Sequence, residues 1–260
     1  MNGKATTKID LKIDDSANQT IRIFAKGENL KLFDTHLDPQ FYDSELIVPD
    51  VVSLFVKCAN LGMFCGSNFN PIQSQASLLM SNFNALLCEE TWEVKCEGID
   101  QGGFRVLMNL LVARNMDSLK ITALRDNSHG IAAQISKLPS YPSTYAYLPF
   151  KIQHEMPLKN TGIRSVQISF LQEPSDEILE NIYDALRLWS DLLTLGGFAP
   201  KNVHPTHSGT FPDLAFLYSS VIIEQLFLEA FICDEMAFNS IINWAIRFHE
   251  FFPVESIVIN

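Results

Sequence analysis

The chain has 260 residues, a formal net charge of −11 and a sequence pI near 4.9. Hydrophobic residues make up 47% and charged residues 19%, which excludes an intrinsically disordered chain because disorder requires low hydrophobicity and high charge. The acidic balance disfavours a general nucleic-acid-binding protein, since phosphate binding requires a basic face. We therefore expect one large or two modest folded domains, with no nucleic acid among the partners.

Composition along the chain also bears on the cellular compartment. The first residues lack the apolar stretch of a signal peptide, and four acidic residues interrupt the most apolar region, residues 220–238. A membrane-spanning helix needs about 20 nearly unbroken apolar residues. Five cysteines without a CxxC spacing favour free, buried thiols over a disulfide framework or a zinc finger. We expect a cytoplasmic protein with no membrane partner.

In chain order, the first predicted element is a β-hairpin within residues 1–27. Apolar and polar residues alternate over residues 9–13 and again over residues 21–23, on either side of the polar segment 14–18. Alternation of this kind is typical of half-buried strands joined by a turn. We expect this hairpin to extend or cover the edge of a sheet.

Residues 28–124 are predicted to form a first folded unit. An apolar stripe from Val48 to Ala59 indicates a helix that ends at Leu61-Gly62, and a second helix is expected over residues 104–114. Strands are expected at residues 30–33, 91–96 and 119–122. Residues 76–87 complete the unit if they form a strand, although their pattern leaves strand and helix both open.

A sequence match at a constant offset of 134 positions predicts an internal repeat. Leu61-Gly62-Met63-Phe64 matches Leu195-Gly196-Gly197-Phe198, and the same offset pairs Asn109 with Asn243. Pro71 and Pro205, Ser74 and Ser208, and Phe104 and Phe238 also coincide. Aligned apolar patterns accompany these identities over residues 48–112 without a gap. The repeat therefore predicts that residues 161–260 form a second unit resembling the first.

The second unit supplies equivalent elements. An apolar stripe from Ile178 to Leu193, preceded by Ser175 as an N-cap, indicates a helix, and a second is expected over residues 236–251. Strands are expected at residues 166–169, 227–232 and 257–259, while residues 214–226 again leave strand and helix open. The predicted fold class is α+β, an internal duplication of a ferredoxin-like unit. Residues 125–160 are the predicted connector, which is rich in proline and tyrosine and expected to pack across the joint.

Two histidines are the closest approach to a metal motif. His204 and His207 are three positions apart, so both could bind one ion, with Asp213 or His249 as a third ligand. The first unit has Asn70 and Gln73 at the matching positions, which favours simple divergence of the loop over a function added to one copy. No phosphate-binding loop, dinucleotide fingerprint or nucleophile motif is present. We therefore expect no cofactor and assign no catalytic residues.

The glycines and cysteines offer little further chemistry. Gly102-Gly103 follows Asp100 at a helix start, where free N–H groups could hold an anion, but a flexible entry turn is the preferred interpretation. Cys65 is expected to be the most exposed thiol. Its position after a helix C-terminus would raise its pKa, which is unfavourable for a nucleophile.

The negative charge is concentrated in the second half. Residues 1–130 carry 12 basic and 16 acidic residues, a net charge of −4, whereas residues 131–260 carry 7 and 14, a net charge of −7. Six acids fall around one predicted helix, opposite its apolar stripe: Glu173, Asp176, Glu177, Glu180, Asp184 and Asp191. They form either an ordinary solvated face or a surface that steers a basic partner.

Three functional hypotheses follow from these patterns. The leading one is a non-enzymatic acidic protein-binding module, in its specific form a bacterial immunity or antitoxin protein that occludes a basic toxin domain through the six acids. The alternative is an enzyme or sensor for a small molecule or metal, with His204 and His207 at the joint between the units. The third is a structural module that pairs with itself, so that monomer and homodimer both remain open.

Overall fold

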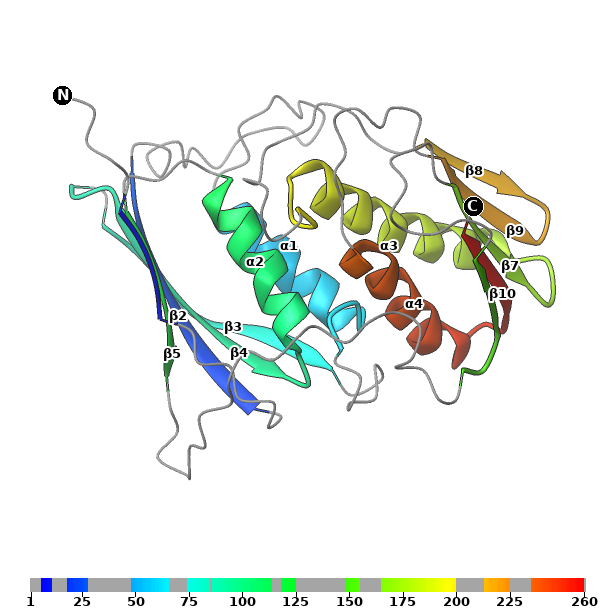
Figure 1. Cartoon of the computed structure of the whole chain (residues 1–260), viewed down its shortest axis with the longest axis horizontal. Coiled ribbons are helices and arrows are strands. Elements are labelled where there is room, and N and C mark those ends of the chain that lie inside the picture. Colours follow the sequence, from blue (N-terminus) through cyan, green and yellow to red (C-terminus); the bar gives the residue numbers. More distant parts are fainter. Residues whose placement is uncertain are drawn as a thin grey trace.

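The computed structural model describes residues 6–10, 18–27, 48–65, 74–84, 86–113, 118–124, 148–154, 165–199, 213–224 and 235–259. It is a mixed α+β structure with two sheets and four helices. The four helices lie in the middle, and one sheet covers them on each side (Figure 1). Each half of the chain contributes one sheet and the two helices that pack on its inner face.

The first half forms a five-stranded sheet in the order β1-β5-β2-β4-β3. Strand β2 is central and antiparallel to both neighbours, whereas β1 at one edge is parallel to β5. The elements are β1 (Thr6–Asp10), β2 (Asn18–Lys26), α1 (Val48–Asn60), β3 (Gln75–Asn84), β4 (Glu89–Glu97), α2 (Gln101–Val112) and β5 (Ser118–Leu124).

The second half forms a sheet in the order β6-β10-β7-β9-β8. Each strand has the position of its counterpart in the first sheet, including β6, which runs parallel to β10 at the edge. The elements are β6 (Lys151–His154), β7 (Ser165–Phe170), α3 (Asp176–Thr194), β8 (Asp213–Leu217), β9 (Ser220–Glu224), α4 (Glu235–His249) and β10 (Val254–Ile259). The two halves thus share both the order of their elements and the order of their strands.

The helices and most strands agree with the sequence predictions. Residues 76–84 lie in β3, so this place is a strand. The single element expected at residues 214–226 is wrong, because residues 214–217 and 220–224 belong to two strands, β8 and β9, joined by a turn at residues 218–219. The predicted strand at 91–96 lies within β4, that at 119–122 within β5, that at 166–169 within β7 and that at 257–259 within β10. The strands predicted at 30–33 and 227–232 lie outside the described residues. In the second sheet β9, at residues 220–224, pairs with β7 and occupies the place that was predicted for residues 227–232.

The predicted N-terminal β-hairpin is wrong. Both strands exist, but β5 lies between β1 and β2, so the two do not pair with each other. Alternation of apolar and polar residues predicts that a segment is a strand, but it does not identify the neighbouring strand. Strand β2 also takes the place in the sheet that was predicted for residues 30–33. Within the predicted connector, residues 151–154 form β6 and extend the second sheet.

Helices α1 and α3 end in the same way, as the Leu-Gly motif predicts. Gly62 has a φ of 82° and Gly196 a φ of 79°, the left-handed region in which glycine carries no steric cost. The Met63 N–H donates to the Cys58 carbonyl, and the Gly197 N–H donates to the Leu192 carbonyl. These bonds close a Schellman-type end on each helix and turn the chain sharply after it.

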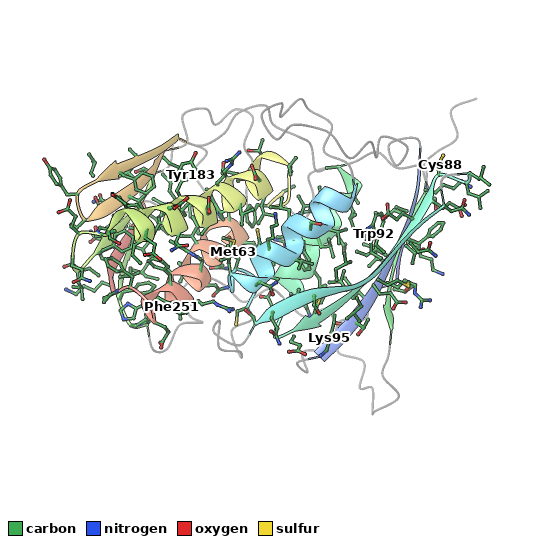
Figure 2. The ribbon with its side chains drawn as sticks, turned by 180° about the vertical axis from the view of Figure 1, so that it is seen from behind. Met63, Cys88, Trp92, Lys95, Tyr183 and Phe251 are labelled. Atoms are coloured by element: carbon green, nitrogen blue, oxygen red, sulfur yellow. The ribbon has the colours of Figure 1, made fainter. Side chains whose placement is uncertain are left out.

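The turns that follow α1 and α3 connect the two halves. Asn109 on α2 donates from Nδ2 to the carbonyls of Gly197 and Ala199, at 2.9 and 3.1 Å. Asn243 on α4 donates from Nδ2 to the carbonyls of Met63 and Cys65, at 3.2 and 3.1 Å. Each asparagine therefore binds the turn of the opposite half, and all the positions in one set lie 134 residues from those in the other. Met63 lies between the two halves (Figure 2).

Close packing supplements these hydrogen bonds at the joint. A Cβ atom on Gly102, at the start of α2, would lie 2.4 Å from Met236 Sδ at the equivalent position of α4. Asp100 caps α2 by accepting a hydrogen bond from the Gly103 N–H at 2.8 Å. The predicted flexible entry turn is therefore wrong, because both glycines are buried and make room for neighbouring side chains.

The core lies between each sheet and its helices. In the first half, Trp92 on β4 points from the sheet toward the helices (Figure 2) and is almost completely buried. Phe55 on α1 stacks on Phe64 with ring centroids 5.1 Å apart. One charged residue shares the inward register, since Glu90 is only 4% exposed. Burial raises the pKa of its carboxyl, although a hydrogen bond from Ser81 opposes this.

The reciprocal hydrogen bonds predict that the asparagines stabilise the joint. Asn243→Ala should lower the free energy of unfolding by about 1–3 kcal/mol, because two carbonyls lose a buried donor. Asn109→Ala should cost less, because Asn109 is only partly buried. Urea denaturation measures both values. Asn181→Ala is the control, since its exposed amide bonds only within α3, and it should stay within about 0.5 kcal/mol of wild type. An Asn243→Ala variant as stable as this control would contradict the prediction.

Candidate functional site: the α3–β8 surface

Helix α3 begins where the sequence predicts and has two different ends. Ser175 is the N-cap, and its side chain accepts a hydrogen bond from the Ile178 N–H. Asp176 and Glu177 occupy the first turn, where acidic side chains interact favourably with the helix dipole. The first half of the helix is largely solvent-exposed on its outer side, and the second half is buried toward the joint.

The structure divides the six predicted acids into two groups. Five of them are exposed on and just before the N-terminal half of α3, namely Glu173, Asp176, Glu177, Glu180 and Asp184. None of these five forms an ion pair within the described part of the chain. By contrast, two glutamates on the outer face of the first sheet are paired, Glu93 with Arg22 and Glu89 with Lys26. Among the described residues, the acids on the exposed side of α3 therefore have no ion-pair partner.

Asp191 does not belong to this exposed face. It is partly buried near the joint, and burial raises the pKa of its carboxyl to about 6, although Arg187 and Lys57 act in the opposite direction. The same region contains Cys58, whose Sγ lies 3.9 Å from the Leu188 carbonyl across the α1–α3 contact. Burial and the charge of Asp191 both raise the pKa of the Cys58 thiol. Asp191 was grouped with the partner-binding acids on helical spacing alone. That spacing does not show that the C-terminal half of α3 packs into the joint.

An apolar cluster beside these acids was not predicted. Tyr183 on α3 is 44% exposed, and its ring centroid lies 6.3 Å from that of Phe216 on β8 (Figure 2). Tyr218 follows at the end of β8 and is 87% exposed, whereas Leu217 points to the other face of the sheet because successive side chains of a strand alternate. Glu180 lies one helical turn before Tyr183, so acidic and aromatic side chains share one face. We call Tyr183, Phe216, Tyr218, Glu177, Glu180 and Asp184 the α3–β8 surface.

Tyr218 has a strained backbone. Leu217 pairs with Ser220, so the loop between β8 and β9 contains only Tyr218 and Ser219. Tyr218 has a φ of 48°, a conformation that costs most non-glycine residues about 1–3 kcal/mol. Two-residue hairpin loops favour glycine, asparagine or aspartate at such a position. A large aromatic residue is held there instead, with its ring almost fully in solvent.

The other sequence candidates gain no support as sites. His204 and His207 lie outside the described residues, so the predicted metal pair has no geometry to assess. Among the residues that the structure describes, no group of three or more histidines, cysteines or acids could hold a metal ion. The helices in this part of the chain include none with the length and apolar character needed to cross a membrane.

The cysteines are free thiols wherever they are described. Cys58, Cys65 and Cys96 are buried, and Cys88 is partly exposed at a hairpin turn. The prediction that Cys65 is the most exposed thiol is wrong, because the turn after α1 packs into the joint. Burial and the nearby Asp100 raise the pKa of Cys65 to about 12, so the expected direction of the pKa change holds for a different physical reason.

Comparison of the chain with protein-family models, curated proteins and solved structures finds no match in any of the three.

The raised pKa of Asp191 predicts a pH-dependent cost to stability. Because the folded state retains this proton up to about pH 6, whereas the unfolded chain releases it near pH 4, stability falls as pH rises through that window. Asp191→Asn removes this titration. Between pH 4 and pH 7 its free energy of unfolding should therefore rise by about 1–3 kcal/mol relative to that of wild type. Urea denaturation across this range measures the difference. The control is Asp184→Asn, which alters an exposed acid on the same helix. If the free energies of unfolding of Asp191→Asn and wild type change in parallel with pH, the assignment to Asp191 is refuted.

Proposed function

We propose that this chain is a non-enzymatic, acidic protein-binding module built from two fused ferredoxin-like units. The duplication is supported by the strand–helix–strand–strand–helix–strand order that follows the extra strand β1 or β6 in each half, which is the order of a split βαβ unit. In the first sheet β2 lies between β5 and β4, with β3 at the edge, and in the second sheet β7 lies between β10 and β9, with β8 at the edge. The reciprocal bonds of Asn109 and Asn243 support a common origin of the two halves.

The main support for the function is the composition of the α3–β8 surface. Exposed aromatic side chains lie next to acids that form no ion pair with other described residues. Energetically important interface residues are often tyrosines, and aromatic residues are enriched at interfaces. The acids add complementarity to a basic partner and would speed its encounter. A surface of this composition fits a protein with an apolar patch surrounded by lysine or arginine.

The strain at Tyr218 is consistent with this role. Tyr218 strains its own turn, and its exposed ring contributes little to the stability of the fold. Strained backbone positions cluster at functional sites, so the outlier favours a contribution to binding. Tyrosine also supplies a large rigid contact area with few rotatable bonds, which limits the entropy lost on binding.

The specific form of the proposal is a bacterial immunity or antitoxin protein. The partner would be a basic toxin domain, and the mechanism would be occlusion. The acids of α3 would occupy the positive surface with which the toxin binds its polyanionic substrate, while the aromatic cluster would hold the complex together. No catalytic group on this chain is needed for such inhibition.

One prediction separates binding from folding at Tyr218. Tyr218→Gly relieves the positive φ, so it should leave the protein as stable as wild type or more stable by about 0.5–1 kcal/mol. The same change should reduce affinity for the partner at least about tenfold, a loss of about 1.4 kcal/mol. Thermal unfolding and binding kinetics would be measured on the same preparations, with the partner drawn from the source organism's lysate and the products of adjacent genes.

Phe251→Ala is the matched control for Tyr218→Gly. Phe251 is an exposed aromatic residue outside the α3–β8 surface, 79% exposed compared with 87% for Tyr218 (Figure 2). The Phe251→Ala variant should bind the partner with the affinity of wild type. Equal affinity of both variants for the partner would exclude Tyr218 from the interface.

A second prediction concerns the charge. Glu180→Lys combined with Asp184→Lys should slow association with the basic partner, and the wild-type on-rate should fall steeply between about 0.05 M and 0.5 M salt. Glu250→Lys combined with Glu255→Lys makes the same change in net charge at exposed acids elsewhere in the second half. If both pairs slow association equally, only the net charge matters. A captured partner that is acidic, or an on-rate indifferent to salt, would argue against the proposed function.

A further inference from the structure

The β3–β4 hairpin of the first half is longer than its counterpart in the second half. β3 has 10 residues and β4 has 9, whereas β8 and β9 have 5 each. The second half forms the same sheet order with the shorter pair, so the extra length is not required for the fold. Cys88, at the turn of the hairpin, lies at the end of the sheet that projects away from the helices (Figure 2).

The projecting part of the hairpin exposes large apolar side chains. Leu78, Leu79 and Met80 on β3 are 44%, 55% and 39% exposed, and Leu86 and Leu87 in the turn are 96% and 52% exposed. Leu78 is in register with the inward-facing Val94 and Met80 with the outward-facing Glu93, so apolar side chains are exposed on both faces of the strand. Exposed apolar side chains gathered on one segment are typical of interaction sites in soluble proteins. The residues come from consecutive positions on the strand, because α1 covers only its beginning, where Ala76 is buried.

The edge of β3 is also a candidate for strand pairing. Within the described residues β3 pairs only with β4, and it is the last strand of its sheet. Natural edge strands are protected by charged residues, proline, bulges or short length. β3 has a bulge at Leu79, which faces no residue of β4, but it contains no charged residue and no proline and is twice as long as β8.

We propose that the β3 edge binds a second copy of this chain, through antiparallel pairing of β3 with the partner's β3 around a twofold axis. The charge distribution selects this occupant. Two copies with a net charge of −11 repel each other, and an edge without charged side chains lets them approach without placing acids opposite acids. A basic protein partner would gain no electrostatic attraction at this edge, whereas it would at the α3–β8 surface.

The geometry of the strand suits such a dimer. Ten residues at about 3.4 Å each give an edge about 34 Å long, which is close to the diameter of a small domain. An arrangement centred near Leu79 would bring Leu78, Leu79 and Met80 of both copies next to the axis, with Leu78 on the inner face of the sheet and Met80 on the outer face. The paired sheets would then be continuous through both copies. This inference is independent of the proposed function, because β3 and the α3–β8 surface belong to different halves of the chain.

The test is the solution mass of the full chain over a range of concentrations. Light scattering and sedimentation should show a shift from 29.3 kDa to twice that mass, with a dissociation constant on the order of 1–10 μM. Leu79→Lys places a positive charge on each copy near the axis and should weaken dimerisation at least about tenfold. Leu171→Lys is the matched control, since Leu171 is an equally accessible leucine, 66% exposed, and lies outside both sheet edges.

Met80→Lys is a second variant, and hydrogen exchange of the wild-type protein provides a readout that requires no variant. Amides of residues 75–84 should become protected as concentration rises, while those of β8 should not. A chain that stays monomeric at about 100 μM would overturn the proposal, because a 10 μM dissociation constant would make it mostly dimeric. A dimer that persists in both lysine variants, or whose protection lies outside β3, would overturn it equally.

Discussion

The side chains of Asn109 and Asn243 determine how the two halves of this protein fit together. Each reaches across the joint to two carbonyls in a turn that has just left a helix, so each half satisfies backbone groups of the other. A turn can present those carbonyls only if the helix stops sharply, which the positive φ of Gly62 and Gly196 allows. The helix ends, the turns and the joint are therefore one connected constraint. A substitution that disrupts a helix end, a turn or an asparagine hydrogen bond is therefore expected to destabilise both halves.

This constraint decides which surfaces are free for other molecules. All four helices are used to join the halves, and the sheets are placed outside them (Figure 1). Within the described residues, the exposed side chains lie mainly on the outer sheet faces, on the edge strands β3 and β8 and on the N-terminal half of α3. The two surfaces for which we propose partners, the α3–β8 surface and the β3 edge, are both of this kind. They differ in chemistry, because one is acidic and aromatic while the other is apolar and uncharged.

The sequence was informative about periodic elements and less so about contacts between them. The stripe from Ile178 to Leu193 and the Leu-Gly ends predicted α1 and α3 well, because amphipathic periodicity and capping are local properties. The neighbour of β1 could not be predicted, since pairing depends on residues far along the chain. Helical spacing grouped Asp191 with exposed acids although the joint covers it. Tyr183 and Phe216 are 33 positions apart, so no local signal revealed their contact; the offset of 134 shared by Asn109 and Asn243 was the one long-range signal available.

The contact between Gly102 and Met236 distinguishes two halves that are otherwise so alike. The two residues occupy equivalent positions, yet they touch, so the position lies where each half meets its own counterpart. A pair of first halves joined in this manner would set glycine against glycine and leave a hole the size of a methionine side chain. A pair of second halves would set methionine against methionine in space that holds only one. The joint therefore fits one copy of each half, and covalent linkage in a single chain guarantees that ratio during synthesis.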